Sequence, residues 1–263
     1  MLRIHDVTKT FFPGTVNERV ALDGLSLTLE AGDFVTVIGS NGAGKSTLMN
    51  AISGRIPADT GTIEIDGRSV GRLPDHRRAS FVGRVFQDPM AGTAPDLTIE
   101  QNLALALRRG RGRGLAMGVT RGRRELFRDE LRALELGLEN RLKARVGLLS
   151  GGQRQALSLL MASFTKPDIL LLDEHTAALD PQRAQLVTQL TKSIVERDGL
   201  TTLMVTHNME QALQLGNRLV MMHEGRIILE LDARQKREAT VESLLGEFAK
   251  IKGAVVDDRT LLG

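Results

Sequence analysis

The sequence of 263 residues contains no cysteine, no tryptophan and no tyrosine. Without cysteine the chain cannot form a disulfide framework, a thiolate metal site or a cysteine nucleophile. No apolar run approaches the ~18 residues that a membrane-spanning helix needs, and even Ile169–Leu172 ends at two acidic residues. The first residues lack both a basic leader and an apolar stretch of about 7 to 15 residues. These absences predict a cytoplasmic protein.

The composition is that of a soluble globular protein. Apolar residues make up 41% of the chain and charged residues 25%, and 35 basic side chains against 32 acidic ones give a net charge of +3. The 27 glycines lie above the usual share of about 7%, which indicates many backbone turns. The length suffices for one large domain or two small ones, and the composition excludes disorder and collagen-like structure.

The pattern of apolar residues predicts an α/β fold. Period-two alternation predicts strands at Leu2–Val7 and Leu25–Glu30, which we expect to form an antiparallel sheet. After residue 30, strand-like and helix-like segments alternate, which favours a sheet covered by helices. The run Phe34–Ile38 is a predicted strand, residues 39–44 a glycine loop, and Lys45–Ser53 a predicted helix that ends at Gly54.

The rest of the chain divides into a helical insertion, a resumed core and a tail. We expect strands at 62–66 and 81–86, a helix at 98–109, and a second helix from the spacing of Phe127, Leu131, Leu134 and Leu138. Continuous apolar runs at 169–172 and 200–205 are typical of buried parallel strands, and 219–222 with 226–231 predicts a hairpin. The prediction is one domain over 1–263, with a core at 1–87 and 166–230, a helical subdomain at 88–165 and a weakly helical tail at 231–263.

A phosphate-binding loop is the strongest motif. The pattern G-x-x-x-x-G-K-[ST] lies between a predicted strand and a predicted helix and is formed by Gly39, Ser40, Asn41, Gly42, Ala43, Gly44, Lys45 and Ser46. Its glycines allow backbone N–H groups to turn toward phosphate oxygens, and the following helix adds its positive end. Lys45 is placed to reach the β- and γ-phosphates, and the Ser46 hydroxyl to bind Mg²⁺.

A pair of carboxylates follows the apolar run 169–172. An apolar strand delivers Asp173 and Glu174 to the carboxyl edge of a sheet, where α/β proteins bind ligands. The Asp173 carboxylate is suited to bind the metal ion. Glu174 points to the other side of the strand, and a carboxylate there can orient or deprotonate an attacking water.

These two motifs and four further ones resemble those of the ATP-binding cassette ATPases. The resemblance covers about residues 1 to 230, and the motifs stand in the order of that family: the phosphate loop 39–47, Gln87 after a strand, Leu-Ser-Gly-Gly-Gln at 149–153, the apolar strand with its acids at 169–174, Ala-Leu-Asp at 178–180, and His207. It implies a P-loop NTPase (RecA-like) core with an N-terminal antiparallel β subdomain and a helical insertion. It also implies ATP hydrolysis with Mg²⁺ as cofactor.

The same resemblance assigns roles to single residues. It extends the phosphate loop to Thr47 and implies a dimer that sandwiches two ATP, each bound by the phosphate loop of one subunit and the segment Ser150, Gly151, Gly152 and Gln153 of the other. It places Gln87 near the γ-phosphate and the metal, and His207 near the γ-phosphate and the water. It places Asp180 at the dimer interface.

Two positions depart from the family pattern. An aromatic ring from the N-terminal loop stacks on adenine in this family, usually a tyrosine, and Phe11 occupies that place with Phe12 as its rival. His175 stands where most transporter ATPases have proline after the glutamate. We assign His175 no catalytic role and interpret it as structural or as a support for a neighbouring site residue.

An arginine-rich stretch runs from Arg108 to Arg124, with seven arginines, five glycines and no acidic residue. We interpret it as a solvated loop within the helical insertion. Contact with RNA phosphates, with anionic lipid head groups or with a permease are alternatives. No phenylalanine lies between Gln87 and Leu126, so the stacking platform of a single-strand binder is missing, and we expect no specific nucleic-acid partner.

The resemblance yields two functional hypotheses. The first is the ATPase subunit of a transporter, most similar to a bacterial importer of a small organic solute such as an amino acid. Its partners are a second cassette, polytopic permease subunits and an extracytoplasmic solute-binding protein, and its place is the inner face of the cell membrane. The alternative is a soluble cassette ATPase of a cluster-assembly, ribosome or nucleic-acid system. Translation-type members carry two cassettes in one chain and DNA-repair members a long coiled coil, and this sequence shows neither.

Overall fold

The computed structural model describes residues 1–110 and 117–260, with side chains as far as Lys250. Its first sheet is the predicted antiparallel one and has the strand order β2-β1-β4-β5. The strands are β1 (Leu2–Phe11), β2 (Arg19–Leu29), β4 (Thr60–Ile65) and β5 (Arg68–Ser69). Because β1 and β2 are longer than their alternation predicts, Phe11 ends a strand and pairs with Arg19 instead of lying in a loop.

The second sheet carries the carboxyl edge that the motifs require. Its strand order is β10-β9-β3-β8-β7-β6, and every neighbouring pair is parallel except β9 with β10. The strands are β3 (Phe34–Gly39), β6 (Val82–Val85), β7 (Ile169–Asp173), β8 (Thr202–Val205), β9 (Arg218–His223) and β10 (Arg226–Leu231). Parallel pairing of β3, β8, β7 and β6 brings the residues that follow these strands to one edge. The predicted parallel strands and hairpin are confirmed.

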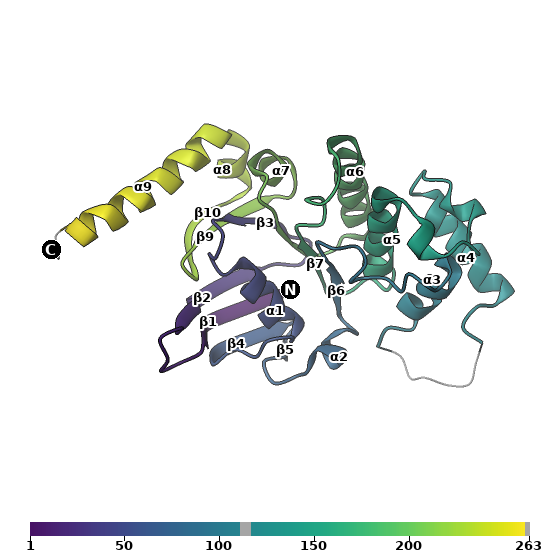
Figure 1. Ribbon diagram of the computed structural model, residues 1–263, viewed down its shortest axis with the longest axis horizontal. Coiled ribbons are helices and arrows are strands. Elements are labelled where there is room, and N and C mark those ends of the chain that lie inside the picture. The colour runs from purple at the N-terminus through teal and green to yellow at the C-terminus, as the bar shows by residue number, and fades with distance from the viewer. Residues whose placement is uncertain (111–116, 261–263) are drawn as a thin grey trace.

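Helices cover both faces of this sheet and extend beyond it (Figure 1). The α-helices are α1 (Lys45–Ser53), α2 (Asp75–Arg78), α3 (Ile99–Leu107), α4 (Arg121–Arg132), α5 (Gly151–Ser163), α6 (Pro181–Asp198), α7 (Met209–Gln214), α8 (Ala233–Glu238) and α9 (Val241–Thr260). Short 3-10 helices lie at Leu138–Asn140 and Val146–Leu148. Among the described residues no helix is both long enough and apolar enough to cross a membrane.

The core places α1 between the two sheets. Leu48, Met49 and Ile52 of α1 are fully buried in one cluster with residues of β1, β2, β3 and β7. A second cluster joins the other face of the parallel sheet to α3, α4, α5 and α6. Each such side chain contributes about 1.5 to 3 kcal/mol by burial, so α1 and the loop before it are held firmly.

The helical insertion differs from its prediction in one helix. The described part of residues 88–165 contains α3, α4, α5 and the two 3-10 helices. The spacing from Phe127 predicts a helix through Leu138, but α4 begins earlier, at Arg121, and ends at Arg132. Glu135 and Gly137 both have positive φ, which breaks the helix. Leu134 and Leu138 are nevertheless buried, because the turn returns them to the same core.

The interpretation of the arginine stretch as a solvated loop is wrong for two of its described residues. Arg109 donates hydrogen bonds to the carbonyl oxygens of Ala162 (3.2 Å) and Met161 (3.3 Å) near the end of α5, and burial lowers its pKa. Arg124 lies on α4 and its Nε donates to Glu100 (2.7 Å), which raises the pKa of Arg124. Both guanidinium groups therefore hold helices of the insertion together. Arg111 and Arg113 lie outside the described residues.

Candidate functional site

The phosphate loop connects β3 to α1 through a backbone that only glycine fits. Gly42 and Gly44 have φ of 83° and 99°, in the left-handed region. A Cβ on Gly44 would lie 2.3 Å from the Ala21 carbonyl oxygen, and one on Gly39 would lie 2.4 Å from that of Met222. Gly44 is also the N-cap of α1 and has no side chain to cap it. The first N–H groups of α1 are thus available to an anion at the helix start.

Lys45 lies inside this loop with its side chain almost fully buried. Its Nζ donates to the carbonyl oxygens of Gly39 (2.7 Å) and Ser40 (3.0 Å). Burial lowers the pKa of Lys45, while the carboxylates of Glu174 and Asp173 act in the opposite direction. An ammonium has three N–H donors, so one remains to meet a phosphate oxygen while the loop carbonyls hold the other two.

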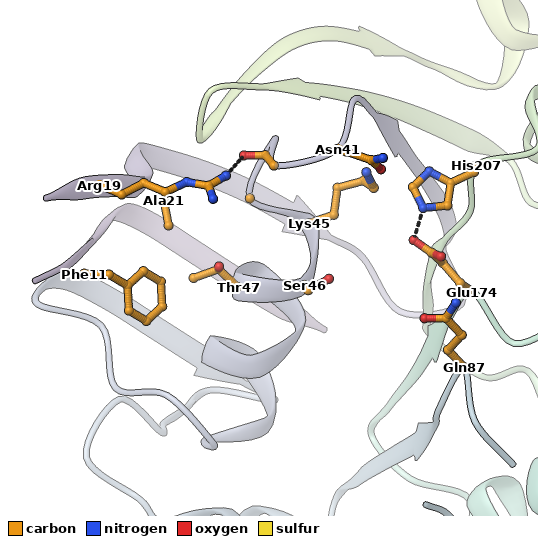
Figure 2. A pocket seen from close by; sticks show the side chains of 12 residues that line it. Phe11, Arg19, Ala21, Asn41, Lys45, Ser46, Thr47, Gln87, Glu174 and His207 are labelled. Carbon is orange, nitrogen blue, oxygen red and sulfur yellow. Dashed lines mark hydrogen bonds and ion pairs between the residues drawn. The ribbon is translucent and has the colours of Figure 1, made fainter. Parts of the chain in front are cut away.

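Glu174 and His207 meet at the sheet edge next to Lys45. The Glu174 carboxylate forms an ion pair with His207 Nε2 (Figure 2). Glu174 follows β7 with φ of 45°, a left-handed conformation that is uncommon for a glutamate and turns the chain away from the strand. Its side chain is 10% exposed, whereas that of His207 is 46% exposed. The pair therefore forms a wall of the site with an imidazole accessible to a ligand.

Asp173 takes a partner that the sequence analysis missed. Arg84 Nη2 donates to its Oδ2 at 2.7 Å, and Arg84 Nη1 reaches Asn50 of α1 at 2.8 Å. The Arg84 guanidinium also lies 4.8 Å from the centre of the Phe86 ring, next to Gln87. The Arg84 guanidinium thus links Asp173, a candidate metal ligand, to α1 and to the segment that contains Gln87. No sequence motif points to Arg84, because its role depends on β6 and β7 lying side by side.

One pocket brings most of the predicted nucleotide residues together. Figure 2 shows Phe11 at one end, Lys45 and Ser46 in the middle, and Glu174, His207 and Gln87 at the other end. The pocket is lined by Phe11, Arg19, Ala21, Asn41, Gly42, Gly44, Lys45, Ser46, Thr47, Gln87, Glu174 and His207. Gly39 and Ser40 contribute the carbonyls that hold Lys45, and Ala43 is buried beneath the loop.

The N-terminal strands supply the end of the pocket opposite Glu174. Phe11 lines the pocket, whereas Phe12 has a positive φ and is 66% exposed outside it. Arg19, which the sequence analysis did not single out, donates to the Gly42 carbonyl oxygen at 2.8 Å. The pairing of Phe11 with Arg19 could not be read from the sequence, because the predicted second strand begins at Leu25.

Residues 149–153 and Asp180 lie outside this pocket lining. Ser150 is the N-cap of α5, where its hydroxyl accepts from the Gln153 backbone N–H and the Gln153 side chain accepts from the Ser150 N–H. Asp180 is the N-cap of α6, where its carboxylate accepts from the Arg183 backbone N–H at 3.1 Å. Gly151 and Gly152 begin α5, so this helix, like α1, starts with backbone N–H groups of the kind that suit an anion. Within one chain, the two predicted halves of the nucleotide site, residues 39–47 and 150–153, therefore do not line the same pocket.

His175 follows Glu174 in the chain, and its side chain is buried. Its Nε2 lies 2.8 Å from the Thr191 hydroxyl, which itself donates to the Val187 carbonyl oxygen at 2.8 Å. The ring nitrogen is therefore the donor in the first bond. Burial lowers the pKa of His175 from its ordinary 6.5 to about 4. The imidazole is neutral and structural in this fold, in agreement with the interpretation of the sequence.

We expect stability to fall in acid because of His175. The unfolded chain takes up the proton below pH 6.5 while the folded chain resists it to about pH 4, so the stability present above pH 6.5 is lost as the pH falls. Between pH 7 and pH 5 the wild-type free energy of unfolding should drop by about 2 kcal/mol more than that of His175→Gln. Urea titrations at both pH values measure the difference. If the free energy of unfolding falls equally in the wild type and in His175→Gln, burial does not lower the pKa of His175 as described.

The donor set fits Mg²⁺ on a nucleotide better than a metal held by protein alone. Among the described residues no group of three or more His, Cys, Asp or Glu side chains could hold a metal ion. Mg²⁺ favours oxygen ligands and in nucleotide sites uses one or two protein groups together with substrate phosphates. Ser46 and Gln87 line the pocket and offer such oxygens, and Asp173 stands behind them in its pair with Arg84.

Comparison with known proteins identifies the family. Residues 22–177 match the sequence model of the family described as ABC transporter. The chain belongs to this family. It is accordingly an ATP-binding ATP hydrolase with the P-loop NTPase fold that the sequence predicts, and the resemblance drawn from its motifs is confirmed.

Three relatives describe the likeness more closely. A tyrosine transport ATP-binding protein of Clostridioides difficile (strain R20291) is 45% identical, over 94% of this chain and 98% of its own length. The methionine import ATP-binding protein MetN of Rhizobium johnstonii is 36% identical, over 88% of this chain and 60% of its own length. The solved ATP-binding cassette MJ0796, a dimer bound to ADP and Pi, superposes with a TM-score of 0.76 at 32% identity, covering 89% of this chain and 99% of that one.

Proposed function

We propose that the chain is the ATPase subunit of an importer for a small organic solute such as an amino acid, and that it drives separate permease subunits. The observation that carries the proposal is a pocket in which the phosphate loop faces the Glu174–His207 pair. The relatives named for tyrosine transport and methionine import favour an amino acid as the solute.

ATP would lie along the pocket from Phe11 to Glu174. The adenine ring would stack on Phe11. This assignment is supported by the position of Phe11 in the pocket lining, whereas Phe12 lies outside the lining. The phosphates lie in residues 39–47, where Lys45 and the first N–H groups of α1 bind their oxygens. Ser46, Gln87 and Asp173 would hold Mg²⁺, which would supply positive charge to offset that of the phosphates.

Hydrolysis requires a positioned water and stabilised charge at the γ-phosphate. Glu174 accepts the proton of the water or orients it, and its left-handed backbone directs the carboxylate into the pocket. His207 keeps the carboxylate in place and offers an N–H to the γ-phosphate. Gln87 lines the pocket at the start of the insertion and would contact the γ-phosphate and the metal, so that the nucleotide state could reach the helical subdomain.

A second copy of the chain, or a similar cassette, completes the site. Ser150, Gly151, Gly152 and Gln153 lie outside the pocket of their own chain and begin a helix whose N-terminus suits a γ-phosphate. In the dimer this helix start faces the nucleotide of the partner, and Asp180 reaches across the interface. The dimeric state of the cassette MJ0796 supports this arrangement.

The remaining partners are those of an importer. Polytopic permease subunits receive the motion of the helical subdomain, and an extracytoplasmic solute-binding protein delivers the solute. The chain then lies in the cytoplasm, peripheral on the inner face of the cell membrane, with no specific nucleic-acid partner.

The test is purification of the tagged full chain from its own cells after mild detergent extraction. The proposal expects a polytopic membrane protein to co-purify, and expects tyrosine, methionine or another amino acid to stimulate ATP hydrolysis in proteoliposomes that hold the complex and its solute-binding protein. A chain that co-purifies only with ribosomal or cluster-assembly proteins would contradict the proposal.

A further inference from the structure

Gln211 of α7 is a buried side chain at the meeting point of three segments. It is 8% exposed, and its amide contacts three threonine hydroxyls. Its Nε2 donates to Thr188 of α6 at 2.8 Å and to Thr176 at 3.1 Å. Its Oε1 accepts from Thr206 at 2.8 Å. A single amide thus bonds the segment after β7, the segment after β8 and helix α6.

The surrounding bonds fix the orientation of this amide. The Thr206 hydroxyl accepts from the Asn208 backbone N–H at 3.1 Å, so its own hydrogen is directed to Gln211 Oε1. The Thr188 hydroxyl donates to the Ala184 carbonyl oxygen at 2.8 Å, so it accepts from Gln211 Nε2. A flipped amide would place its oxygen against the acceptor side of the Thr188 hydroxyl and its N–H group against the hydrogen of the Thr206 hydroxyl. The observed orientation avoids both conflicts.

These contacts lie directly beside the two proposed catalytic residues. Thr176 is two residues after Glu174, and Thr206 immediately precedes His207. The two segments are already tied at the sheet edge by the Glu174 N–H, which donates to the Val205 carbonyl oxygen at 3.0 Å. Beyond that bond the two segments leave the sheet, and the side chain of Gln211 links them through Thr176 and Thr206. The ion pair between Glu174 and His207 bridges the same two segments.

We propose that Gln211 is a positioning residue that holds Glu174 and His207 in the geometry needed for hydrolysis. This inference rests on the proposed function of those two residues. Gln211 does not line the nucleotide pocket, so it acts through Thr176 and Thr206. Small displacements of a catalytic group cost large factors in rate, whereas ATP affinity depends on the phosphate loop and Phe11 and stays unchanged.

The first experiment separates rate from binding in the full-length chain. Gln211→Leu should lower kcat for ATP at least about tenfold and leave the Kd for ATP within about twofold. Gln211→Glu should restore most of the rate, because a carboxylate still accepts from Thr206 and Thr176, and the Thr188 hydroxyl can rotate its hydrogen from the Ala184 carbonyl to the carboxylate. Gln214→Leu, an exposed glutamine on the same helix, should behave as wild type. Unchanged kcat in Gln211→Leu, or a loss that Gln211→Glu does not restore, would overturn the proposal.

A double-mutant cycle distinguishes positioning from a general loss of structure. In the His207→Ala background the pair to be positioned is absent, so Gln211→Leu should reduce the single-turnover rate by less than about twofold further. An equal reduction in both backgrounds would overturn the positioning role. If His207→Ala and Glu174→Gln themselves hydrolyse ATP at the wild-type rate, the proposed function fails. If those two lose activity and Gln211→Leu does not, only the inference about Gln211 fails.

Discussion

Replacement of Glu174 by glutamine is expected to reduce ATP hydrolysis by about 10² to 10⁴-fold while ATP still binds. Glutamine keeps the shape of the side chain but cannot accept the proton of the attacking water. It also removes a negative charge that repels the γ-phosphate, so the ATP-bound state should persist. Phosphate release under single-turnover conditions and nucleotide titration by calorimetry measure the two effects separately.

The chain provides a matched control for this substitution. Glu224 also has a φ of 45° but lies in the turn between β9 and β10, with its side chain 77% exposed. Glu224→Gln should therefore hydrolyse ATP at the wild-type rate. Hydrolysis by Glu174→Gln at the wild-type rate would contradict the catalytic assignment and leave nucleotide binding as the role of the pocket.

Replacement of Lys45 by alanine is expected to weaken ATP binding by about a hundredfold or more. The buried ammonium provides charge-assisted bonds to the phosphates, and such bonds are worth about 1.5 to 3 kcal/mol each. Alanine leaves no cation in the loop and also frees the carbonyl oxygens of Gly39 and Ser40. Calorimetric titration with ATP gives the change in Kd directly.

A second lysine tests whether the loss is local. Lys143 is exposed on the helical insertion, away from the phosphate loop, and Lys143→Ala should bind ATP as wild type does. If Lys45→Ala and wild type bind ATP with equal affinity, the phosphate loop has been assigned wrongly. A melting temperature for each variant shows whether the fold has been retained.

The motif residues could be predicted from the sequence because local geometry determines them. A strand, a glycine loop and a helix in direct succession specify the phosphate loop, and the structure places Gly42, Gly44 and Lys45 accordingly. The segment after an apolar strand likewise delivers Glu174 to the sheet edge. The meeting of Glu174 with His207 follows from parallel pairing of β7 and β8, which the two apolar runs already indicate.

Residues whose role depends on distant pairing could not be predicted. Arg84 becomes the partner of Asp173 only when β6 lies beside β7, and Arg19 reaches the phosphate loop only because β2 extends beyond its apolar part. Arg109 looks solvated in a run of arginines, yet the end of α5 provides carbonyl acceptors for it. The apolar pattern of a single sequence shows which face of a helix or strand is buried. It does not show which other element packs against that face.

The most direct test of the shared nucleotide site is the mass of Glu174→Gln in solution. By light scattering, the variant should double its mass with ATP and Mg²⁺ but not with ADP. Adding Ser150→Asp should prevent the dimer, because aspartate retains the N-cap of α5 and places a negative charge toward the partner's γ-phosphate. A Glu174→Gln chain that stays monomeric with ATP, or dimerises equally well with Ser150→Asp, would contradict a site built from two chains.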